Sequence, residues 1–381
     1  MIITNAKIVL AHEVINGTVH IQDGLIKEIA QGNSMLPEAI NLDGDILIPG
    51  LVELHTDNFE RHLMPRPKTR WAELPALIAH DVELIGAGIT TVFDSIGIGE
   101  ADSKSVRGMG FDAVMHALHF SIENQLLKSD HFIHIRCELP APNTVELFQA
   151  FANDDRLRLI SLMDHTPGQR QFEDISQARN YYTGKKGWTH SFFDERVAAG
   201  PDLQERYAKP NRQYFVDFCK SHQIAMASHD DTTLEHVQQA IDEGASICEF
   251  PTRLNAAQAA HQNHLAVIMG APNLVRGGSH SGNVAAKDLA LAGHLDILSS
   301  DYIPNSLLSA AFKLTEVANF SLPAAIATVT LQPAKAVGLK DRGQIAPNQI
   351  ADLVRIRMLR NSQRQEFPFV SSVWRAGIKV V

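Results

Sequence analysis

The chain has 381 residues, of which 45% are hydrophobic and 20% are charged, a size that fits one large domain and a smaller one. Its 43 acidic residues outnumber its 34 basic ones, the formal charge is −9, and no stretch concentrates enough basic charge for a nucleic-acid groove. The first residues lack a signal-peptide pattern, and no apolar run approaches the roughly 18 residues of a membrane span. Cys137, Cys219 and Cys248 have no CxxC spacing and are expected to be buried, reduced thiols. We therefore expect a cytoplasmic protein whose partners include neither nucleic acid nor membrane.

Both ends of the chain have the pattern of short strands joined by turns. Near the start, strands are predicted over residues 2–6, 17–21, 25–29 and 45–48, with hairpin turns at Asn16-Gly17, Asp23-Gly24 and Asp43-Gly44. Near the end, the same pattern returns at residues 343–345, 351–356 and 373–378. The two ends therefore predict one small β-sandwich domain composed of residues 1–49 and 340–381.

The middle of the chain, residues 50–339, alternates short apolar runs with longer helical patterns. Eight strands are predicted, at residues 51–54, 89–93, 132–137, 159–163, 224–228, 246–250, 266–269 and 295–298. Helices are predicted over residues 71–85, 143–152, 212–221 and 234–242, the last capped by Thr232 or Thr233 and closed by Gly244. Because eight strand-helix units close on themselves, the predicted fold class is α/β, a (β/α)8 TIM-type barrel. An open, doubly wound parallel sheet is the alternative.

Polar residues follow nearly every predicted barrel strand, which is where barrel enzymes carry their catalytic groups. His55 and Asp57 are two positions apart after the first strand, so both side chains are expected on one face. Glu138, His165 and His229 end the third, fourth and fifth strands, and together these groups form the N and O ligand set of a divalent metal. Each has a plain structural alternative: a surface turn for His55-Thr56-Asp57, a glutamate paired with an arginine, or a histidine bonded to a backbone carbonyl.

Asp301 ends the eighth strand, where it is expected to hold a water molecule and accept its proton. A bound divalent ion lowers the pKa of water towards neutrality, so a carboxylate at this position suits hydrolysis. Capping of the helix that starts near Pro304 is the structural alternative.

Basic residues gather in the loops expected at the same end of the barrel. Arg66 and Lys68 lie in a proline-containing loop after the first strand, Arg276 and His280 in a glycine-rich loop after the seventh, and Arg170 after the fourth. In a chain of net charge −9, cations collected there indicate a small anionic substrate that carries phosphate groups. A solvated basic loop is the alternative for each.

The chain resembles the amidohydrolase superfamily over its whole length. The resemblance rests on the β-rich ends, the strand ILIPGLVELHTD, the segment LDILSSD and the closing segment GQIAPNQIADLV, with further likeness in MDHTPGQRQF, ASHDD and MGAPNLVRGGSHSGN. The resemblance implies that His55 and Asp57 are a pair of metal ligands, that His229 is a further metal ligand and that Asp301 is catalytic. The longer segments imply release of diphosphate from a ribose 5-triphosphate during phosphonate use.

The sequence departs from the usual pattern of that superfamily at three places. The common HxH motif is HxD here, the fourth strand offers no lysine to bridge two ions, and Glu249 stands where the sixth strand often has histidine. Glu138 is taken as the substitute bridge, as in members that use a third-strand glutamate. One or two divalent ions are expected; zinc is the expected metal, and manganese and iron are the alternatives.

Two other functions fit the same residues. A C–N hydrolase acting on a cyclic amide or a phosphorylated N-acyl sugar would use the same metal centre, and the basic loops argue against it. A catalytically silent assembly partner would not need every polar strand end. We expect a metal-dependent diphosphatase that forms a homo-oligomer.

Overall fold

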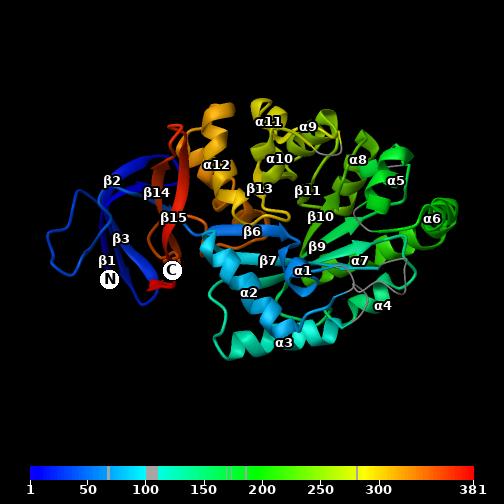
Figure 1. Ribbon diagram of the computed structural model, residues 1–381, viewed down its shortest axis with the longest axis horizontal. Coiled ribbons are helices and arrows are strands. Elements are labelled where there is room, and N and C mark those ends of the chain that lie inside the picture. The colour runs from blue at the N-terminus through cyan, green and yellow to red at the C-terminus, as the bar shows by residue number, and fades with distance from the viewer. Residues whose placement is uncertain (67–68, 100–109, 169, 173, 185–186, 280–281) are drawn as a thin grey trace.

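The computed structural model in Figure 1 describes residues 1–381 except 67–68, 100–109, 169, 173, 185–186 and 280–281. Lys68 and His280 lie outside the described residues. Two eight-stranded sheets organise the chain, one built from both termini and the other from the middle. In Figure 1 the two chain ends lie together on the terminal sheet, beside the helix-covered barrel.

The middle of the chain forms a parallel barrel, which confirms the predicted (β/α)8 fold. Its strands, in chain order and in order around the sheet, are β6 (Leu51–Thr56), β7 (Ile89–Ile98), β8 (Asp130–Glu138), β9 (Leu157–Met163), β10 (Ala225–His229), β11 (Ile247–Glu249), β12 (Ala266–Gly270) and β13 (Ile297–Ser299). Each predicted strand overlaps one of these. Every neighbouring pair is parallel, as crossover connections require.

Helices connect the strands and cover the outside of the barrel (Figure 1). They are α1 (Asn58–Leu63), α2 (Glu73–Gly86), α3 (Phe111–Glu123), α4 (Thr144–Phe148), α5 (Ile175–Gly184), α6 (His190–Leu203), α7 (Lys209–His222), α8 (Leu234–Glu243), α9 (Leu254–Gln262), α10 (Ala271–Arg276), α11 (Ala286–Leu291), α12 (Ser306–Val317), α13 (Leu322–Ala327) and α14 (Leu331–Ala336), with short turns η2 (Arg170–Phe172) and η3 (Gln204–Ala208). The predicted caps of α8 are present: Thr233 accepts a hydrogen bond from His236 N, and Gly244 has a φ of 84°.

The first and last barrel strands meet along a short seam. Asp57 N donates to Asp301 O at 2.8 Å, and Asp301 N donates to His55 O at 3.1 Å. Beneath these bonds the buried Glu53 carboxylate accepts from His55 N at 2.7 Å and from Ser300 N at 2.6 Å. Burial raises the pKa of Glu53 to about 7, although the two backbone N–H groups oppose this shift. We call these four hydrogen bonds the barrel seam.

The inside of the barrel has an apolar floor, which is packed rather than hollow. Its buried side chains come from all eight strands and from the segment that follows them: Val52, Leu54, Phe93, Phe132, Leu159, Ala227, Ile247, Ile268, Ile297 and Ala334. Because side chains alternate along a strand, the residues two positions beyond the floor residues of β8, β9, β10 and β11 also point inward, closer to the barrel mouth.

The terminal sheet contains β1 (Ile2–Val9), β2 (Val14–Gln22), β3 (Leu25–Gln31), β4 (Ile40–Asn41), β5 (Ile46–Pro49), β14 (Leu353–Arg360), β15 (Glu366–Arg375) and β16 (Ile378–Lys379). Strand β5 joins the two ends of the chain, because it pairs with β1 on one side and with β14 on the other. A buried core that includes Ile3, Leu47, Leu353 and Trp374 holds this sheet together.

One predicted turn is wrong. Asn16-Gly17 lies inside β2, whereas the chain turns earlier, where Leu10 N donates to Glu13 O at 2.9 Å. Gly17 is required for close approach instead, since a Cβ atom there would lie 2.4 Å from Ala30 O of the neighbouring strand. The Asp23-Gly24 turn is confirmed, with φ angles of 53° and 78°.

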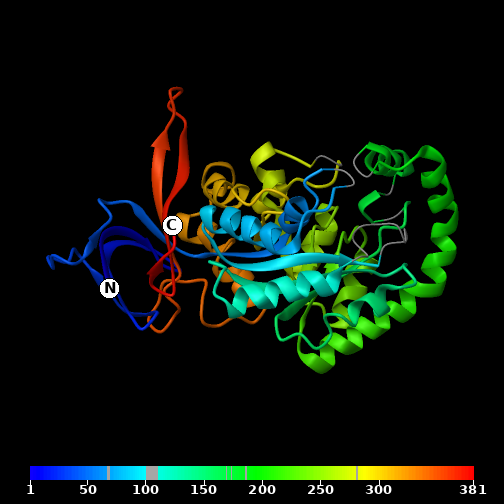
Figure 2. The same cartoon turned by 60° about the horizontal axis from the view of Figure 1, so that its bottom comes forward.

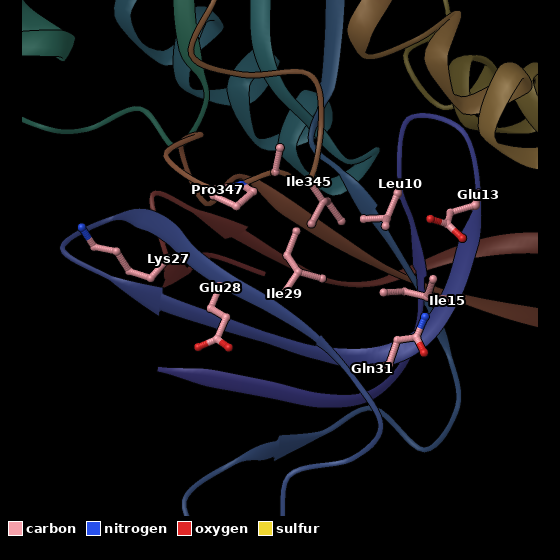
Figure 3. Close-up of a pocket in the computed structure, with 10 residues that line it drawn as sticks. Leu10, Glu13, Ile15, Lys27, Glu28, Ile29, Gln31, Ile345 and Pro347 are labelled. Atoms are coloured by element: carbon pink, nitrogen blue, oxygen red, sulfur yellow. The ribbon is translucent and has the colours of Figure 1, made fainter.

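Two surface features belong to the terminal sheet. The β14–β15 hairpin extends away from the body of the molecule (Figure 2). A shallow hollow of about 500 Å³ lies between β2, β3 and residues 345–347, lined mainly by Leu10, Ile15, Ile29 and Ile345 (Figure 3). Its lining also includes Glu13, Lys27 and Glu28 and contains no histidine or cysteine.

A buried polar cluster fastens α2 to the outside of β7 and β8. Asp94 accepts from His80 Nε2 and from His131 Nδ1, each at 2.7 Å. His131 Nε2 donates to Asp81 at 3.2 Å, so both of its ring nitrogens donate to carboxylates. Burial lowers the pKa of His131, but Asp94 and Asp81 outweigh burial and raise it to about 9. His131 is therefore an imidazolium at neutral pH.

This cluster predicts a pH-dependent stability. Because the folded-state pKa of His131 lies above its unfolded value of about 6.5, its contribution is full below pH 6.5 and is lost as the pH rises towards 9. The contribution is on the order of 3 kcal/mol. Urea unfolding between pH 6.5 and 9 should show a falling free energy of unfolding in the wild type and a flatter profile in His131→Gln. Equal slopes in the two proteins would contradict this role. Asp81→Asn, which keeps the side-chain size, should also reduce the slope.

Candidate metal centre

A layer of polar side chains lies directly above the apolar floor. His134, Ser161, His229 and Glu249 each stand two positions beyond a floor residue of their own strand, and all four are buried. Ser161 Oγ donates to Glu249 Oε2 at 2.7 Å and lies 2.6 Å from His134 Nε2. On these four strands the inward-facing side chain is apolar in the floor and polar two positions later, so the apolar core gives way to a polar site within one layer of side chains.

The first donor group consists of His55, Asp57 and Asp301, at the barrel seam. One ligand atom from each lies within 4.8 Å of the others. Asp57 is not part of β6 but the residue before α1, so its approach to His55 comes from the seam rather than from strand alternation. His55 and Asp57 offer an imidazole and a carboxylate, ligand types that suit a divalent ion, and Asp301 adds a second carboxylate beside them.

Glu249 orients the imidazole of that group. Its Oε1 lies 2.8 Å from His55 Nδ1, which leaves Nε2 as the ring nitrogen available for a metal. Burial opposes both charged forms, but their mutual attraction outweighs it, raising the pKa of His55 and lowering that of Glu249. Glu249 Oε2 also lies 3.8 Å from His229 Nε2. Glu249 therefore lies close to two histidines from different strands, His55 of β6 and His229 of β10.

The second donor group consists of His165, His229 and Asp230, again with ligand atoms within 4.8 Å of one another. Glu138 holds His165 through both carboxylate oxygens: Oε1 accepts from His165 N at 2.9 Å and Oε2 from His165 Nδ1 at 2.5 Å. In the contacts present here Glu138 orients His165, as Glu249 orients His55. His165 Nε2 is left facing Asp230 Oδ2 at 3.7 Å.

This second group fits a divalent cation. Both ring nitrogens of His229 and the Oδ2 atom of Asp230 are buried and make no hydrogen bond, although His229 Nδ1 and Asp230 Oδ2 are 2.9 Å apart. Leaving buried polar atoms without partners is costly, and a metal ion bound to one ring nitrogen of His229 and to Asp230 Oδ2 would satisfy two of the three. Asp230 also has a left-handed backbone, with a φ of 54°, a conformation that often marks functional positions.

The predicted cations occupy different environments. Arg66 is exposed in the loop after α1, and Arg276 is exposed at the last residue of α10. Arg170 is only 6% exposed, and its Nη1 donates to His229 O and to Asp231 Oδ1, both at 2.9 Å. These contacts hold the end of β10, so Arg170 positions the residue before Asp230.

Four site residues were not predicted: His134, Arg136, Ser161 and Asp230. His134, Arg136 and Ser161 lie on strands, and the missing signal was the period of two counted back from the strand ends. Arg136 shares the inward face of β8 with His134 and Glu138 and donates to Asp57 Oδ1 at 2.6 Å. Asp230 directly follows His229 at the end of β10 and is one of the polar residues there, but no role was assigned to it.

Comparison with known proteins identifies the family. The model of the amidohydrolase family matches residues 46–377. The chain belongs to the amidohydrolase family. This amidohydrolase is 42% identical, over 382 residues that cover 100% of both chains, to the alpha-D-ribose 1-methylphosphonate 5-triphosphate diphosphatase of Escherichia coli (strain K12).

Solved structures of distant sequence share the fold of this amidohydrolase. Molinate hydrolase has a TM-score of 0.66 at 14% identity, with 100% of this chain and 94% of that chain covered. N-acetylglucosamine-6-phosphate deacetylase from Pasteurella multocida has a TM-score of 0.64 at 14% identity, with 100% and 99% covered. Among the described residues, no helix has the length and apolar character needed to cross a membrane.

The second donor group predicts which variants lose metal. His229→Ala and Asp230→Asn should each lower the affinity for a divalent ion by at least about 10-fold. Each substitution removes a ligand, the imidazole of His229 or the carboxylate of Asp230, whose buried atoms make no hydrogen bond. Metal content after dialysis, measured by elemental analysis, is the readout. His119→Ala is the control, since His119 also pairs with an aspartate, Asp154 at 2.7 Å, but lies on the outer helix α3. Wild-type metal content in His229→Ala would contradict the assignment.

Proposed function

We propose that this chain is a metal-dependent hydrolase that converts α-D-ribose 1-methylphosphonate 5-triphosphate, or a close ribose 5-triphosphate, to the 5-phosphate and diphosphate. The observation that carries the proposal is the 42% identity to the diphosphatase over the full length of both chains. The two donor groups at the barrel mouth provide the chemistry that such a reaction needs.

We assign the metal-binding role to His55, Asp57, His165, His229 and Asp230, with Glu138 and Glu249 as the carboxylates that orient the two imidazoles. One or two divalent ions bound there, with zinc the proposed metal and manganese or iron the alternatives, would supply Lewis-acid chemistry for water and phosphoryl oxygens. Glu138 remains a candidate bridge if His165 turns away from it when metal binds.

Asp301 is the proposed catalytic base. Its backbone is held at the barrel seam from both sides, through Asp57 N and His55 O, so its carboxylate is attached to a rigid point of the barrel. A fixed carboxylate at the mouth is well suited to orient a water molecule and accept its proton as the water attacks phosphorus. The backbone φ of 56° at Asp301 is a second left-handed position at the site.

The reaction is proposed to occur at the α-phosphorus. Water adds to this atom, the bond from the α-phosphorus to the oxygen that bridges to the β-phosphorus breaks, and that oxygen leaves with diphosphate. The exposed Arg66 and Arg276 are proposed to bind the outer phosphate groups, together with Lys68 and His280, which lie outside the described residues. Arg170 supports His229 from behind the strand.

We extend the proposal to the organisation of the protein. Residues 1–49 and 340–381 are proposed as one small domain and 50–339 as the catalytic barrel, with the division of strands between the two sheets as support. The three buried, unpaired cysteines support a reducing compartment, and we propose the cytoplasm. We also propose that the protein is a homo-oligomer.

The role of Asp301 predicts a separation of metal binding from turnover. Asp301→Asn should retain bound metal and lose about 10²- to 10⁴-fold in kcat, because the amide keeps the shape of the side chain but accepts no proton. Steady-state kinetics and metal analysis of the same sample test this. A turnover number equal to that of the wild type would reject Asp301 as the base.

The bond that breaks can be identified by isotope labelling. Hydrolysis of a ribose 5-triphosphate in ¹⁸O-water should place the label in the ribose 5-phosphate product and leave diphosphate unlabelled, because water attacks the α-phosphorus. Mass spectrometry of both products is the measurement. Label in diphosphate, or orthophosphate as the first product, would overturn the proposed orientation. Hydrolysis of an N-acyl sugar phosphate instead would favour the C–N hydrolase.

A further inference from the structure

Arg136 places a positive charge inside the barrel mouth. It lies on β8 between His134 and Glu138, and all three share the inward face of the strand. Its side chain is 13% exposed, and Nη1 donates to Asp57 Oδ1 at 2.6 Å. Arg136 therefore differs from the exposed Arg66 and Arg276 and from the buried Arg170, because it is partly exposed and lies at the next inward position of β8 beyond His134 of the polar layer.

The guanidinium of Arg136 acts on both donor groups. It contacts Asp57 of the first group directly, and Glu138, two residues along the same face, holds His165 of the second group. Burial lowers the pKa of His55 and of His165, their carboxylate partners raise it more strongly, and the charge of Arg136 lowers it, so Arg136 lies within electrostatic range of both histidines. The guanidinium of Arg136 therefore lies between the first and second donor groups.

A fixed cation in the barrel mouth adds to the positive charge that bound divalent ions would supply. Asp57, the carboxylate that Arg136 contacts, is also one of the proposed metal ligands. An anion with several negatively charged oxygens would be attracted both to the guanidinium and to the ions. Phosphoryl groups have this chemistry, and the planar guanidinium pairs with two of their oxygens at once. A neutral amide would gain no such compensation.

We propose that Arg136 binds the α-phosphoryl group of the substrate, the group at which the reaction occurs, in the space shared by the two donor groups. This inference rests on the proposed diphosphatase function and assigns a binding and specificity role within that site. Arg136 stabilises the charge on the α-phosphoryl oxygens, while the exposed Arg66 and Arg276 bind the outer phosphate groups. It releases or shares its contact with Asp57 when the phosphoryl group is bound.

The test measures which phosphate depends on Arg136. Ribose 5-phosphate, whose phosphate corresponds to the α-phosphoryl group, and inorganic diphosphate are titrated calorimetrically into metal-loaded protein. Arg136→Met should weaken ribose 5-phosphate binding by about 10- to 100-fold and diphosphate binding much less, because the lost contact is charge-assisted. Arg136→Lys should fall between, since it keeps the charge but not the fork. Metal content should stay at the wild-type level in both variants.

Arg212→Met is the matched control. Arg212 is 15% exposed and pairs with one carboxylate, Glu243 at 2.9 Å, but lies on α7 outside the barrel. It should bind both ligands as the wild type does. If Arg136→Met does not fold, the loss of ribose 5-phosphate affinity in Arg136→Lys decides the question.

Three results would overturn the inference: unchanged ribose 5-phosphate affinity in the metal-loaded Arg136 variants, equal weakening of both ligands, or loss of metal matching that of Asp57→Asn. The last would mean that Arg136 serves only to hold Asp57. Failure of the proposed function is separate, since it would appear as a wild-type protein that hydrolyses no ribose 5-triphosphate. Dependence of ribose 5-phosphate binding on Arg136 can be measured in either case.

Discussion

The barrel seam is the constraint on which the site depends. Eight parallel strands form a closed barrel only if the first strand contacts the last. Here that contact consists of the backbone hydrogen bonds of Asp301 with His55 and Asp57 and of the Glu53 carboxylate, which accepts from His55 N and Ser300 N. The same backbone atoms carry His55, Asp57 and Asp301. Closing the barrel and assembling the first donor group are consequently one event, which makes the geometry of the site as rigid as the fold.

The second principle of the site is the use of buried carboxylates to orient imidazoles. Glu249 and Glu138 come from different strands, yet each holds the Nδ1 atom of a histidine and leaves Nε2 for another ligand. Such pairs are stable inside a protein because each charge is compensated by a specific partner rather than by water. Arg136 adds a positive charge beside Asp57, and we propose that this charge links the site to an anionic ligand.

Much of the fold, and part of the set of candidate donor residues, could be predicted from the sequence. The eight strands were recognisable because short apolar runs alternate with helical patterns, and His55 and His229 stand directly at strand ends. The burial of Arg170 was not predictable, since a cation after a strand can equally face solvent or fold back on Asp231. The turn predicted at Asn16-Gly17 was wrong for a similar reason. A glycine can be required either by a turn or by the close approach of another strand, and only the position of the neighbouring strand shows that Gly17 is the second case.

The left-handed backbone at Asp230 and Asp301 has a consequence for how this protein can evolve. A residue other than glycine in that conformation costs roughly 1 kcal/mol or more, and the rest of the fold must compensate for it. Glycine at either position would relieve the strain and stabilise the chain while removing a carboxylate from the site. Selection for thermal stability alone would thus favour variants that lack one of these two carboxylates.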